Sequence, residues 1–308
     1  MRSRQLECFI RVCELGSITK AAATLNIAQP ALGIQIKALE REFGVQLLER
    51  NILGTTPTPA GRTFLTEAKF ILRRLQDLKR TLREQVEGAP QMLTLGISPS
   101  LSTLLATRLL ERVRATMPRV TLTVIEELSH VLNEQVEAGE LDLALIYNAP
   151  PSHAYAQEPM LREILDLVTN AGSPFDVAEP IRLRDLADIE LTMPSGGDVL
   201  RRVIEDEMQA AGLSPRITFP INSMPAIKAV IARGIACGIL PASAVTAEVA
   251  ACTLKVRRII EPSMWRTLYL VRPKTGEPPE AANGVAAVLK SLVTELCAEN
   301  PTFEPIAT

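Results

Sequence analysis

The chain has 308 residues, of which 47% are hydrophobic and 22% charged. This length predicts two or three globular domains. No apolar run approaches the roughly 20 residues that span a bilayer, and the N-terminus lacks the apolar segment of a signal peptide, so we expect a cytoplasmic protein without a membrane partner. The five cysteines are scattered without CxxC or metal-ligand spacing, which predicts buried thiols in a reducing compartment, no metal and no cofactor.

The formal net charge of −2 is unevenly distributed along the chain. Residues 1–90 contain 14 Lys and Arg against 9 Asp and Glu, whereas the remaining residues contain 19 against 26. A basic N-terminal part on an acidic body indicates that only the first part meets a polyanion. The excess is small, so this feature alone is weak evidence.

Three helices are predicted in the N-terminal part. Apolar side chains recur at helical spacing before Gly16, in a second helix that Ser17 can cap, and in a third helix from Pro30 to Gly44. Two short helices joined by a tight turn at residues 26–28 are typical of a helix-turn-helix motif. The expected inward-facing residues are Leu6, Phe9, Ile10, Cys13, Ile18, Ala22, Leu25, Leu32, Ile36, Leu39 and Phe43.

The outer face of the third helix carries Gln29, Gly33 and Lys37, with Pro30 and Ile34 beside them. In a helix-turn-helix the N-terminal end of this helix enters the major groove of DNA. The alternative is a plain three-helix bundle whose polar face is only solvated. The helical pattern alone does not decide between these interpretations.

A small hairpin, or wing, is predicted after the three helices. Residues 46–50 indicate one strand, residues 51–54 a turn, and Thr55 with Thr56 the returning strand. Arg50 is expected near the tip, where it can meet a DNA phosphate. Thr58 then caps a helix that starts at Pro59.

Residues 4–61 resemble the winged helix-turn-helix of the LysR-type transcriptional regulators. The motifs GSITKAA, AQPAL, the Leu39-Glu40 pair, GVQLLER and TPAG carry the resemblance without a gap. It implies a transcriptional regulator that binds double-stranded DNA through residues 1–60. Serine is usual in the family at the position of Gly33, so no side-chain contact is expected there. The expected DNA contacts are Thr19, Gln29, Pro30, Ile34, Lys37, Arg50 and Thr56.

A long helix is predicted over residues 61–90. Its apolar residues are spaced 4, 3, 4, 3 and 4 from Phe64 to Leu82, which is the seam of a coiled coil held for about three heptads. The alternative is a helix packed on its own domain. The LysR resemblance implies a linker helix that pairs two chains, in a dimer or a tetramer. The expected dimerisation residues are Phe64, Ile71, Leu75, Leu78 and Leu82.

Strands and helices alternate from residue 91 onward, as in a parallel α/β sheet. We therefore expect a two-lobed α/β domain over residues 91–300, like that of periplasmic binding proteins. Lobe I is predicted at about 91–163 and 267–300, and lobe II at about 164–266. Residues 299–308 are expected to be poorly ordered or loosely docked. The predicted strands cover 92–98, 120–127, 141–148, 190–195, 216–222, 236–241 and 267–273, and the helices 104–118, 131–140, 199–212, 226–234 and 285–297.

Polar residues follow several of these strands where helices begin. Free N–H groups and hydroxyls at such positions can hold an anion in the cleft between two α/β units. Each serine or asparagine taken singly is better explained as a helix cap, but together they favour a small-molecule site. The LysR resemblance implies an effector in this cleft, often a carboxylate or another small anion. The expected effector-binding residues are Ser98, Ser100, Ser102, Tyr147, Ser195, Asn222 and Ser223.

Three other functions were weighed. An enzyme would need a catalytic constellation, yet His130 and His153 have no partners at metal-ligand spacing and no GxGxxG, GxxxxGK[ST] or GxSxG is present. A two-lobed solute-binding protein, the main alternative, predicts a signal peptide and no helix-turn-helix. A coiled-coil adaptor needs neither wing nor cleft. The sequence therefore predicts a LysR-like, effector-responsive regulator, and it leaves the effector, the target genes and the sign of regulation open.

Overall fold

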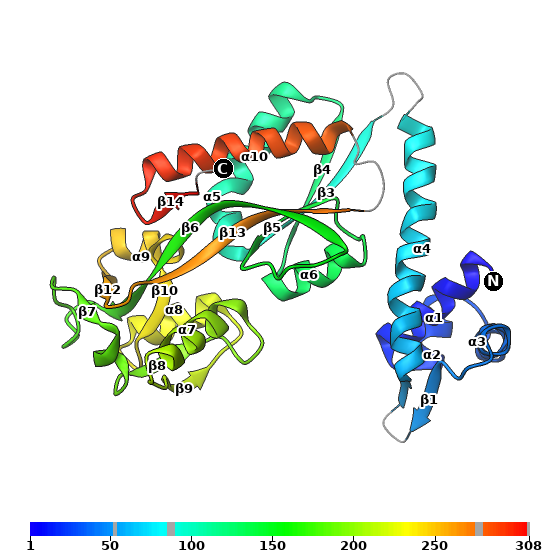
Figure 1. Ribbon diagram of the computed structural model, residues 1–308, viewed down its shortest axis with the longest axis horizontal. Helices are drawn as coiled ribbons and strands as arrows, with labels where there is room; N and C mark the ends of the chain where they lie inside the picture. The colour runs from blue at the N-terminus through cyan, green and yellow to red at the C-terminus, as the bar shows by residue number, and fades with distance from the viewer. Residues whose placement is uncertain (52–53, 85–89, 275–279, 307–308) are drawn as a thin grey trace. The chain divides into compact units, whose positions relative to one another are not determined.

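The computed structural model describes residues 1–51, 54–84, 90–274 and 280–306 (Figure 1). The chain forms two compact units, Met1–Ala89 with Ala138–Glu140, and Pro90–Glu137 with Leu141–Thr308. The predicted segments 1–60 and 61–90 thus belong to one unit. We call these the N-terminal unit and the C-terminal unit and describe each by itself.

The N-terminal unit contains the predicted helices and wing. Gly16 (φ 59°) and Gly44 (φ 68°) end the first and third helices in the left-handed conformation that glycine adopts without strain. The Ser17 hydroxyl accepts a hydrogen bond from the Lys20 N–H (3.3 Å), so the predicted cap is present. The elements are α1 (Ser3–Leu15), α2 (Ile18–Thr24), α3 (Gln29–Phe43), β1 (Leu48–Asn51), β2 (Gly54–Pro57) and α4 (Pro59–Glu84).

The core of this unit follows the predicted apolar stripes with one exception. Phe9, Leu32 and Leu39 are fully buried. Phe43 was predicted to be buried but is 47% exposed, because it lies at the last turn of α3 and packs only edge-on against the Phe64 ring, with the ring centroids 5.1 Å apart. The wing also starts later than predicted, at Leu48 instead of residue 46.

Gly61 explains the TPAG motif. The Thr58 hydroxyl caps α4 by accepting a hydrogen bond from the Gly61 N–H (2.9 Å). A β-carbon on Gly61 would lie 1.9 Å from the carbonyl oxygen of Leu47, so only glycine permits this close approach of α4 to the chain before the wing.

The C-terminal unit is built on a mixed sheet in the order β10-β6-β13-β5-β3-β4 (Figure 1). The strands β3, β4 and β5 pair in parallel as predicted, but β13, β10, β11 and β14 run antiparallel to β6. The sheet is therefore mixed, whereas the alternation of strands and helices predicted a parallel one. The strands of this sheet are β3 (Gln91–Ile97), β4 (Val120–Glu126), β5 (Leu143–Tyr147), β6 (Tyr155–Asn170), β10 (Gly238–Pro241), β11 (Leu254–Arg257), β13 (Met264–Pro273) and β14 (Phe303–Pro305).

The long strands β6 and β13 contribute to two main hydrophobic cores. Leu161 and Leu268 belong to a core with β3, α5 and α10, whereas Leu165 and Met264 belong to a core with α7 and α8. We call the part of the unit around the core with β3, α5 and α10 lobe I, and the part around the core with α7 and α8 lobe II. The remaining elements are α5 (Pro99–Thr116), α6 (Ser129–Glu137), β7 (Ile181–Arg182), η1 (Leu183–Leu186), β8 (Glu190–Met193), α7 (Val199–Ala210), β9 (Arg216–Pro220), α8 (Met224–Ala232), η2 (Ala242–Val245), α9 (Thr246–Ala250), β12 (Ile259–Ile260) and α10 (Glu280–Glu299).

The C-terminal tail is docked, contrary to expectation. Phe303 is only 3% exposed and lies in the lobe I core, and β14 pairs with the middle of β6. One buried aromatic ring and a short strand ladder hold this segment. It was not predicted because a three-residue strand is too short to show a periodic pattern in the sequence.

Within the described residues, the segment Ala281–Glu299 is long and apolar enough by composition to cross a membrane. Val285, Leu289 and Leu292 of this helix, α10, are buried in the lobe I core. Arg112 of α5 donates a hydrogen bond to Glu295 of α10 (2.6 Å), so these two helices lie side by side. The apolar composition of α10 therefore reflects its place in a protein core.

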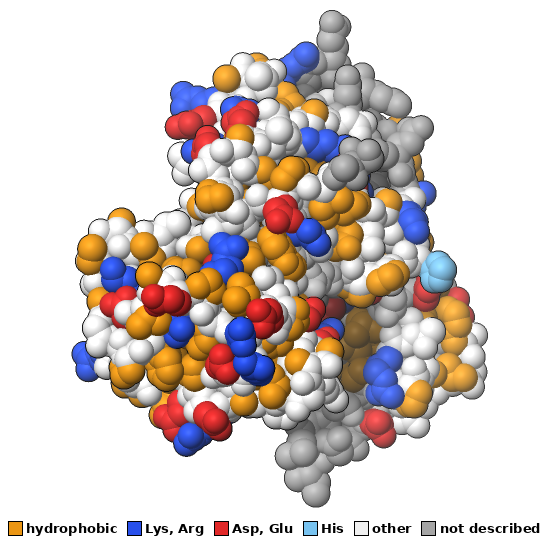
Figure 2. Space-filling model, turned by 60° about the vertical axis from the view of Figure 1, so that its left-hand side comes forward, with side chains coloured by type: hydrophobic (Ala, Val, Ile, Leu, Met, Phe, Trp, Pro, Cys, Tyr) orange, Lys and Arg blue, Asp and Glu red, His pale blue; other side chains and the backbone are white. Residues whose placement is uncertain are grey.

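The charged side chains of the molecule are mixed in sign. On the face drawn in Figure 2, the described Lys and Arg side chains are interspersed with Asp and Glu among apolar residues. Several pair locally, such as Arg162 with Glu304 (2.7 Å) and Lys290 with Glu158 (2.6 Å). The surface seen there has no broad area of one sign.

Candidate DNA-facing surface and effector cavity

The outer face of α3 is exposed in its own unit. Gln29, Pro30, Ile34 and Lys37 are all exposed, and Ile34 is 61% exposed although it is a large apolar residue. The opposite side of α3 supplies Leu32, Ile36 and Leu39 to the core. The helix thus presents a ready-made surface that combines amide, ammonium and apolar groups.

The other predicted DNA contacts lie near this helix in sequence or on the wing. Thr19 at the start of α2 and Thr56 on β2 are exposed. Arg50 lies on β1, where its backbone is opposite Thr55, but its side chain lies outside the described residues. The backbone of Arg50 therefore lies near the wing tip as predicted, and its contact with DNA stays a prediction.

Glu40 fastens the wing to α3, a role that we did not predict. Its carboxylate accepts hydrogen bonds from the N–H groups of Leu47 (3.0 Å) and Leu48 (3.2 Å). The neighbouring Leu39 is fully buried. The Leu39-Glu40 pair therefore joins the core to the wing, which sets the position of β1 relative to α3.

Gly33 has open space around it. An added β-carbon would meet nothing within 4 Å in this unit, so packing does not require glycine here. We expect Gly33→Ala to stabilise α3 by about 1 kcal/mol, because alanine is the better helix former. Native-state hydrogen exchange of the α3 amides in the full-length protein measures this gain.

The matched variant Gly61→Ala should do the opposite, because its β-carbon would collide with the Leu47 carbonyl. If Gly33→Ala stabilises α3 but weakens DNA binding, glycine serves close approach of the helix to DNA. If DNA affinity is unchanged, glycine is merely tolerated. A loss of stability in Gly33→Ala would contradict the prediction.

The apolar stripe of α4 divides into two parts. Phe64 packs against Phe9 with ring centroids 5.0 Å apart, and Ala68 is 1% exposed, so both belong to the core of their own unit. Phe64 therefore packs partly within its own unit, and its role in the dimer seam stays a prediction. Ile71 is half-buried, and further along the helix Leu75, Leu78 and Leu82 are 42%, 56% and 57% exposed.

A cavity of about 550 Å³ lies in the C-terminal unit between the two lobes. Five of the seven predicted effector-binding residues line it. Ser102 does not line the cavity, because it lies further along α5. Ser195 does not line it either, but its N–H donates a hydrogen bond to the Asn222 side chain (2.9 Å) and so orients that side chain. The predicted residues that line the cavity are Ser98, Ser100, Tyr147, Asn222 and Ser223.

Two of these serines have different surroundings. The Ser223 hydroxyl caps α8 by accepting a hydrogen bond from the Ala226 N–H (3.4 Å). Ser98 is the N-cap residue of α5 but its side chain forms no cap hydrogen bond. Its buried Oγ has no hydrogen-bond partner among the described residues. Buried hydroxyls are normally satisfied, so Ser98 has an unmet hydrogen-bonding group at the cavity wall.

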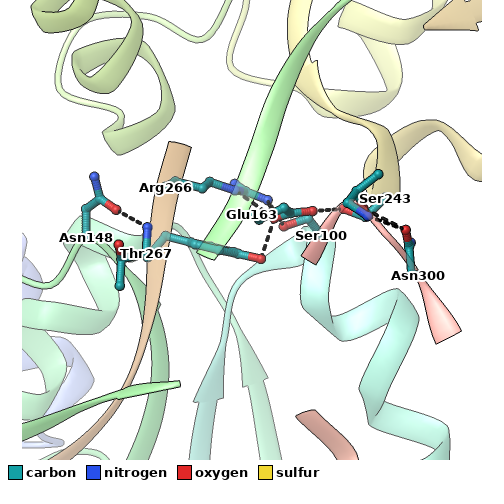
Figure 3. Close-up of polar contacts among 9 residues, drawn as sticks. Ser100, Asn148, Glu163, Ser243, Arg266, Thr267 and Asn300 are labelled. Atoms are coloured by element: carbon teal, nitrogen blue, oxygen red, sulfur yellow. Dashed lines mark hydrogen bonds and ion pairs between the residues drawn. The ribbon is translucent and has the colours of Figure 1, made fainter. Parts of the chain in front are cut away.

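A buried charged network borders the cavity (Figure 3). Arg266 of β13 donates two hydrogen bonds to the Glu163 carboxylate of β6 (2.9 and 2.7 Å), and a third to the Ser100 hydroxyl (3.0 Å). The same carboxylate accepts hydrogen bonds from the hydroxyls of Tyr147 (2.6 Å) and Ser243. The network thus joins α5 and β5 of lobe I to η2 of lobe II.

The charged side chains of the network are almost completely buried. Glu163 is fully buried and Arg266 is 6% exposed, and the Arg266 guanidinium stacks on the Tyr147 ring at 3.6 Å. Burial, with the nearby Glu163 carboxylate adding to it, raises the pKa of the Tyr147 hydroxyl well above its ordinary value, although Arg266 opposes this. The hydroxyl therefore stays protonated and donates to Glu163.

Ser100 and Tyr147 of this network were predicted from sequence, whereas Glu163, Ser243 and Arg266 were not. The signal of the network is the presence of charged residues within strands rich in apolar residues, as in REILDLV around Glu163 and MWRTLYL around Arg266. Several charged residues that line the cavity were not predicted either. Their sequence positions, after strands or at the start of helices, are shared by many surface residues and therefore did not distinguish them. The missed charged residues are Glu126, Glu127, Asp198, Lys228, Glu248 and Arg266. Among the described residues no group of His, Cys, Asp and Glu is placed to hold a metal ion.

A helix-turn-helix with a wing, followed by a two-lobed domain with a cavity between its lobes, defines a ligand-responsive DNA-binding regulator. Residues 3–62 match the family described as "Bacterial regulatory helix-turn-helix protein, lysR family", and residues 87–293 match "LysR substrate binding domain". The chain therefore belongs to the LysR family of transcriptional regulators, as the sequence motifs predicted. It is a regulator and not an enzyme.

Relatives and solved structures cover nearly the whole chain. It is 32% identical over 308 residues to the nitrogen assimilation regulatory protein nac of Klebsiella aerogenes, with all of both chains covered. It is 28% identical over 271 residues to the DNA-binding transcriptional dual regulator OxyR of Escherichia coli, covering 88% of this chain and 89% of OxyR. It resembles full-length CbnR in complex with its target DNA at a TM-score of 0.62 and 25% identity, covering 96% of this chain and 99% of CbnR.

Proposed function

We propose that this regulator binds operator DNA through the exposed face of α3, and that the wing contacts the flanking backbone. The observation that carries the proposal is the exposure of Gln29, Ile34 and Lys37 on one face of α3. Glutamine can form a bidentate pair with adenine, and isoleucine can touch a thymine methyl in the major groove. Lys37, Arg50 and the two threonines Thr19 and Thr56 are proposed to contact phosphates.

Replacing Gln29 with alanine tests this face. Sequence discrimination should fall by about 1–3 kcal/mol if the contact is bidentate, while affinity for unrelated DNA stays nearly unchanged. Competition gel shifts with operator and scrambled duplexes measure the difference at a fixed salt concentration, because binding weakens steeply as salt rises.

Gln35→Ala is the matched control, since Gln35 is half-buried on a different side of the same helix. Its sequence preference should equal that of the parent protein. If Gln29→Ala keeps full preference, a different face reads the bases.

The second part of the proposal is a small effector bound in the cavity. Support comes from Ser98, whose buried hydroxyl lacks a partner, and from the N-terminus of α5, whose partial positive charge favours an anionic group. Pro99 occupies the first turn and has no N–H, so the N–H of Ser100 and the Ser98 hydroxyl are the donors proposed to receive a carboxylate. An anionic group on the effector was also the expectation from sequence.

Coupling between cavity and DNA is proposed to run through the angle between the lobes. The Glu163–Arg266 network holds residues of both lobes and borders the cavity, so a ligand that contacts it shifts the balance between lobe arrangements. In a dimer or tetramer paired by α4, such a shift changes the spacing of the DNA-binding units and the bending of the operator.

A further inference from the structure

We propose that the cavity binds an amphipathic α-amino acid: its carboxylate lies at the N-terminus of α5, its ammonium faces Glu126 and Glu127, and its apolar side chain lies against lobe II. This inference rests on the proposed function and specifies the chemical class of the effector.

The charges of the cavity wall disfavour a simple anion. Of the two basic residues that line it, Lys228 is paired with Glu248 (2.6 Å) and Arg266 with Glu163 (2.7 Å). Burial opposes the effect, but the hydrogen bond from Lys228 lowers the pKa of the Glu248 carboxyl below its ordinary value, so this pair stays ionised. Neither cation is therefore left without a carboxylate partner.

The acidic residues outnumber these cations. Glu126 and Glu127 line the cavity, and no hydrogen bond or ion pair joins their carboxylates to any other described side chain. Asp198 also lines it and has a structural task, because it caps α7 by accepting from the Leu200 N–H (2.8 Å). A ligand with a carboxylate alone would meet a wall of net negative charge, whereas an ammonium group is attracted to it.

The register of the sheet places the backbone of Glu126 and Glu127 beside Ile97, the residue that precedes Ser98. Glu126 on β4 is paired with Ile97 on β3, and the Glu127 N–H donates to the Ile97 carbonyl (3.3 Å). Ser98 follows Ile97 directly and supplies the unpartnered buried hydroxyl. An α-amino acid carries its carboxylate and ammonium on one carbon, so it needs donors and carboxylates at neighbouring positions of this kind.

Lobe II also contributes apolar side chains to the cavity wall. Val199, Leu200, Ile221, Met224 and Ile227 contribute to the lining from lobe II. Burying an apolar ligand side chain there stabilises the complex by roughly 25 cal/mol per Å² of apolar surface removed from water. A long apolar or amphipathic side chain fits this wall better than a second charged group does.

The test is calorimetric titration of the full-length protein with the standard L-amino acids, followed by comparison of each ligand with two analogues. One analogue is the carboxylic acid that lacks the amino group, and the other is the amine that lacks the carboxylate. We expect an apolar or amphipathic amino acid to bind and both analogues to bind at least about tenfold more weakly, since each loses one charge-assisted contact.

The double variant Glu126→Gln/Glu127→Gln should weaken amino-acid binding at least about tenfold while leaving binding of the carboxylic acid unchanged or stronger. Glu134→Gln is the control, because Glu134 is an exposed acid on α6 outside the cavity. Ser98→Ala should weaken the amino acid and the carboxylic acid alike.

Three results would overturn the inference: equal affinity for the acid and the amino acid, unchanged amino-acid affinity in the double variant, or no binding of any amino acid. Failure of the proposed function is recognised separately. If the carboxylic acid binds and alters the footprint on DNA, the regulator has an anionic effector and only the amino-acid inference is wrong. If the protein does not bind DNA at low salt, the proposed function itself is wrong.

Discussion

Replacing Glu163 with alanine should lower the unfolding free energy of the C-terminal unit by about 3–5 kcal/mol, because removal of one partner of a buried ion pair leaves the other charge uncompensated. Arg266 would keep only the Ser100 hydroxyl as a hydrogen-bond acceptor. The hydroxyls of Tyr147 and Ser243 would also lose their acceptor, and each buried unsatisfied group adds to the loss.

Urea denaturation followed by tryptophan fluorescence measures this change. Trp265 is the single tryptophan of the chain and lies next to Arg266 on β13, so its signal reports the C-terminal unit. Glu158→Ala is the control on the same strand, because its partner Lys290 is on the surface and the exposed pair contributes about 0–1 kcal/mol.

The variant Glu163→Gln separates the effect of the negative charge on stability from the effect of the side chain's shape. It retains an acceptor oxygen for one neighbour but removes the negative charge opposite Arg266, so its stability should lie between those of the parent and Glu163→Ala. If Glu163→Ala unfolds at the same urea concentration as Glu158→Ala, the network contributes no net stability and its role is confined to the cavity.

Replacing Leu75 with aspartate should dissociate the oligomer. Leu75, Leu78 and Leu82 form the exposed part of the α4 stripe, and a second copy of this helix is the partner that the heptad spacing predicts. An unpaired carboxylate buried in such a seam weakens association by about 3 kcal/mol or more, which raises the dimer Kd more than a hundredfold. Sedimentation velocity should show monomers.

Operator binding should weaken with it, because a monomer reaches only one half-site at a time. Thr66→Asp provides the matched control. Thr66 is exposed and lies nine residues before Leu75, about two and a half turns away and therefore on the opposite side of α4. The same charge there should leave the oligomer intact. An unchanged oligomer in Leu75→Asp would place the interface in the C-terminal unit.

The parts of the fold that follow from local chemistry were predictable from sequence. Gly16, Ser17 and Gly44 mark helix ends through backbone conformation and capping, and these are properties of a few neighbouring residues. The apolar spacing of α3 likewise determined which side is buried. The prediction failed at Phe43, where the helical period continues but the helix ends and few packing partners remain.

Features that depend on distant pairing were not predictable. The antiparallel contacts of β6 join it to strands from other parts of the chain, and its own sequence shows no preference for direction. The residues of the cavity show the same difference between local and distant features. Ser98 and Asn222 were predicted because serine and asparagine are recognisable at helix starts. Glu163 and Arg266 form a pair only through the register of β6 and β13. Ser195 and Ser102 show that a helix start alone does not place a side chain in the cavity.

The position of β6 in the chain has a consequence for biosynthesis. Every strand that pairs with this 16-residue strand, namely β10, β11, β13 and β14, follows it in the sequence. During translation β6 therefore leaves the ribosome with both of its edges unpaired and its apolar side chains uncovered. Such edges are templates for pairing with other chains. Neither lobe core closes until Met264–Pro273 has been made, so a nascent chain stalled before that point is expected to be prone to aggregation.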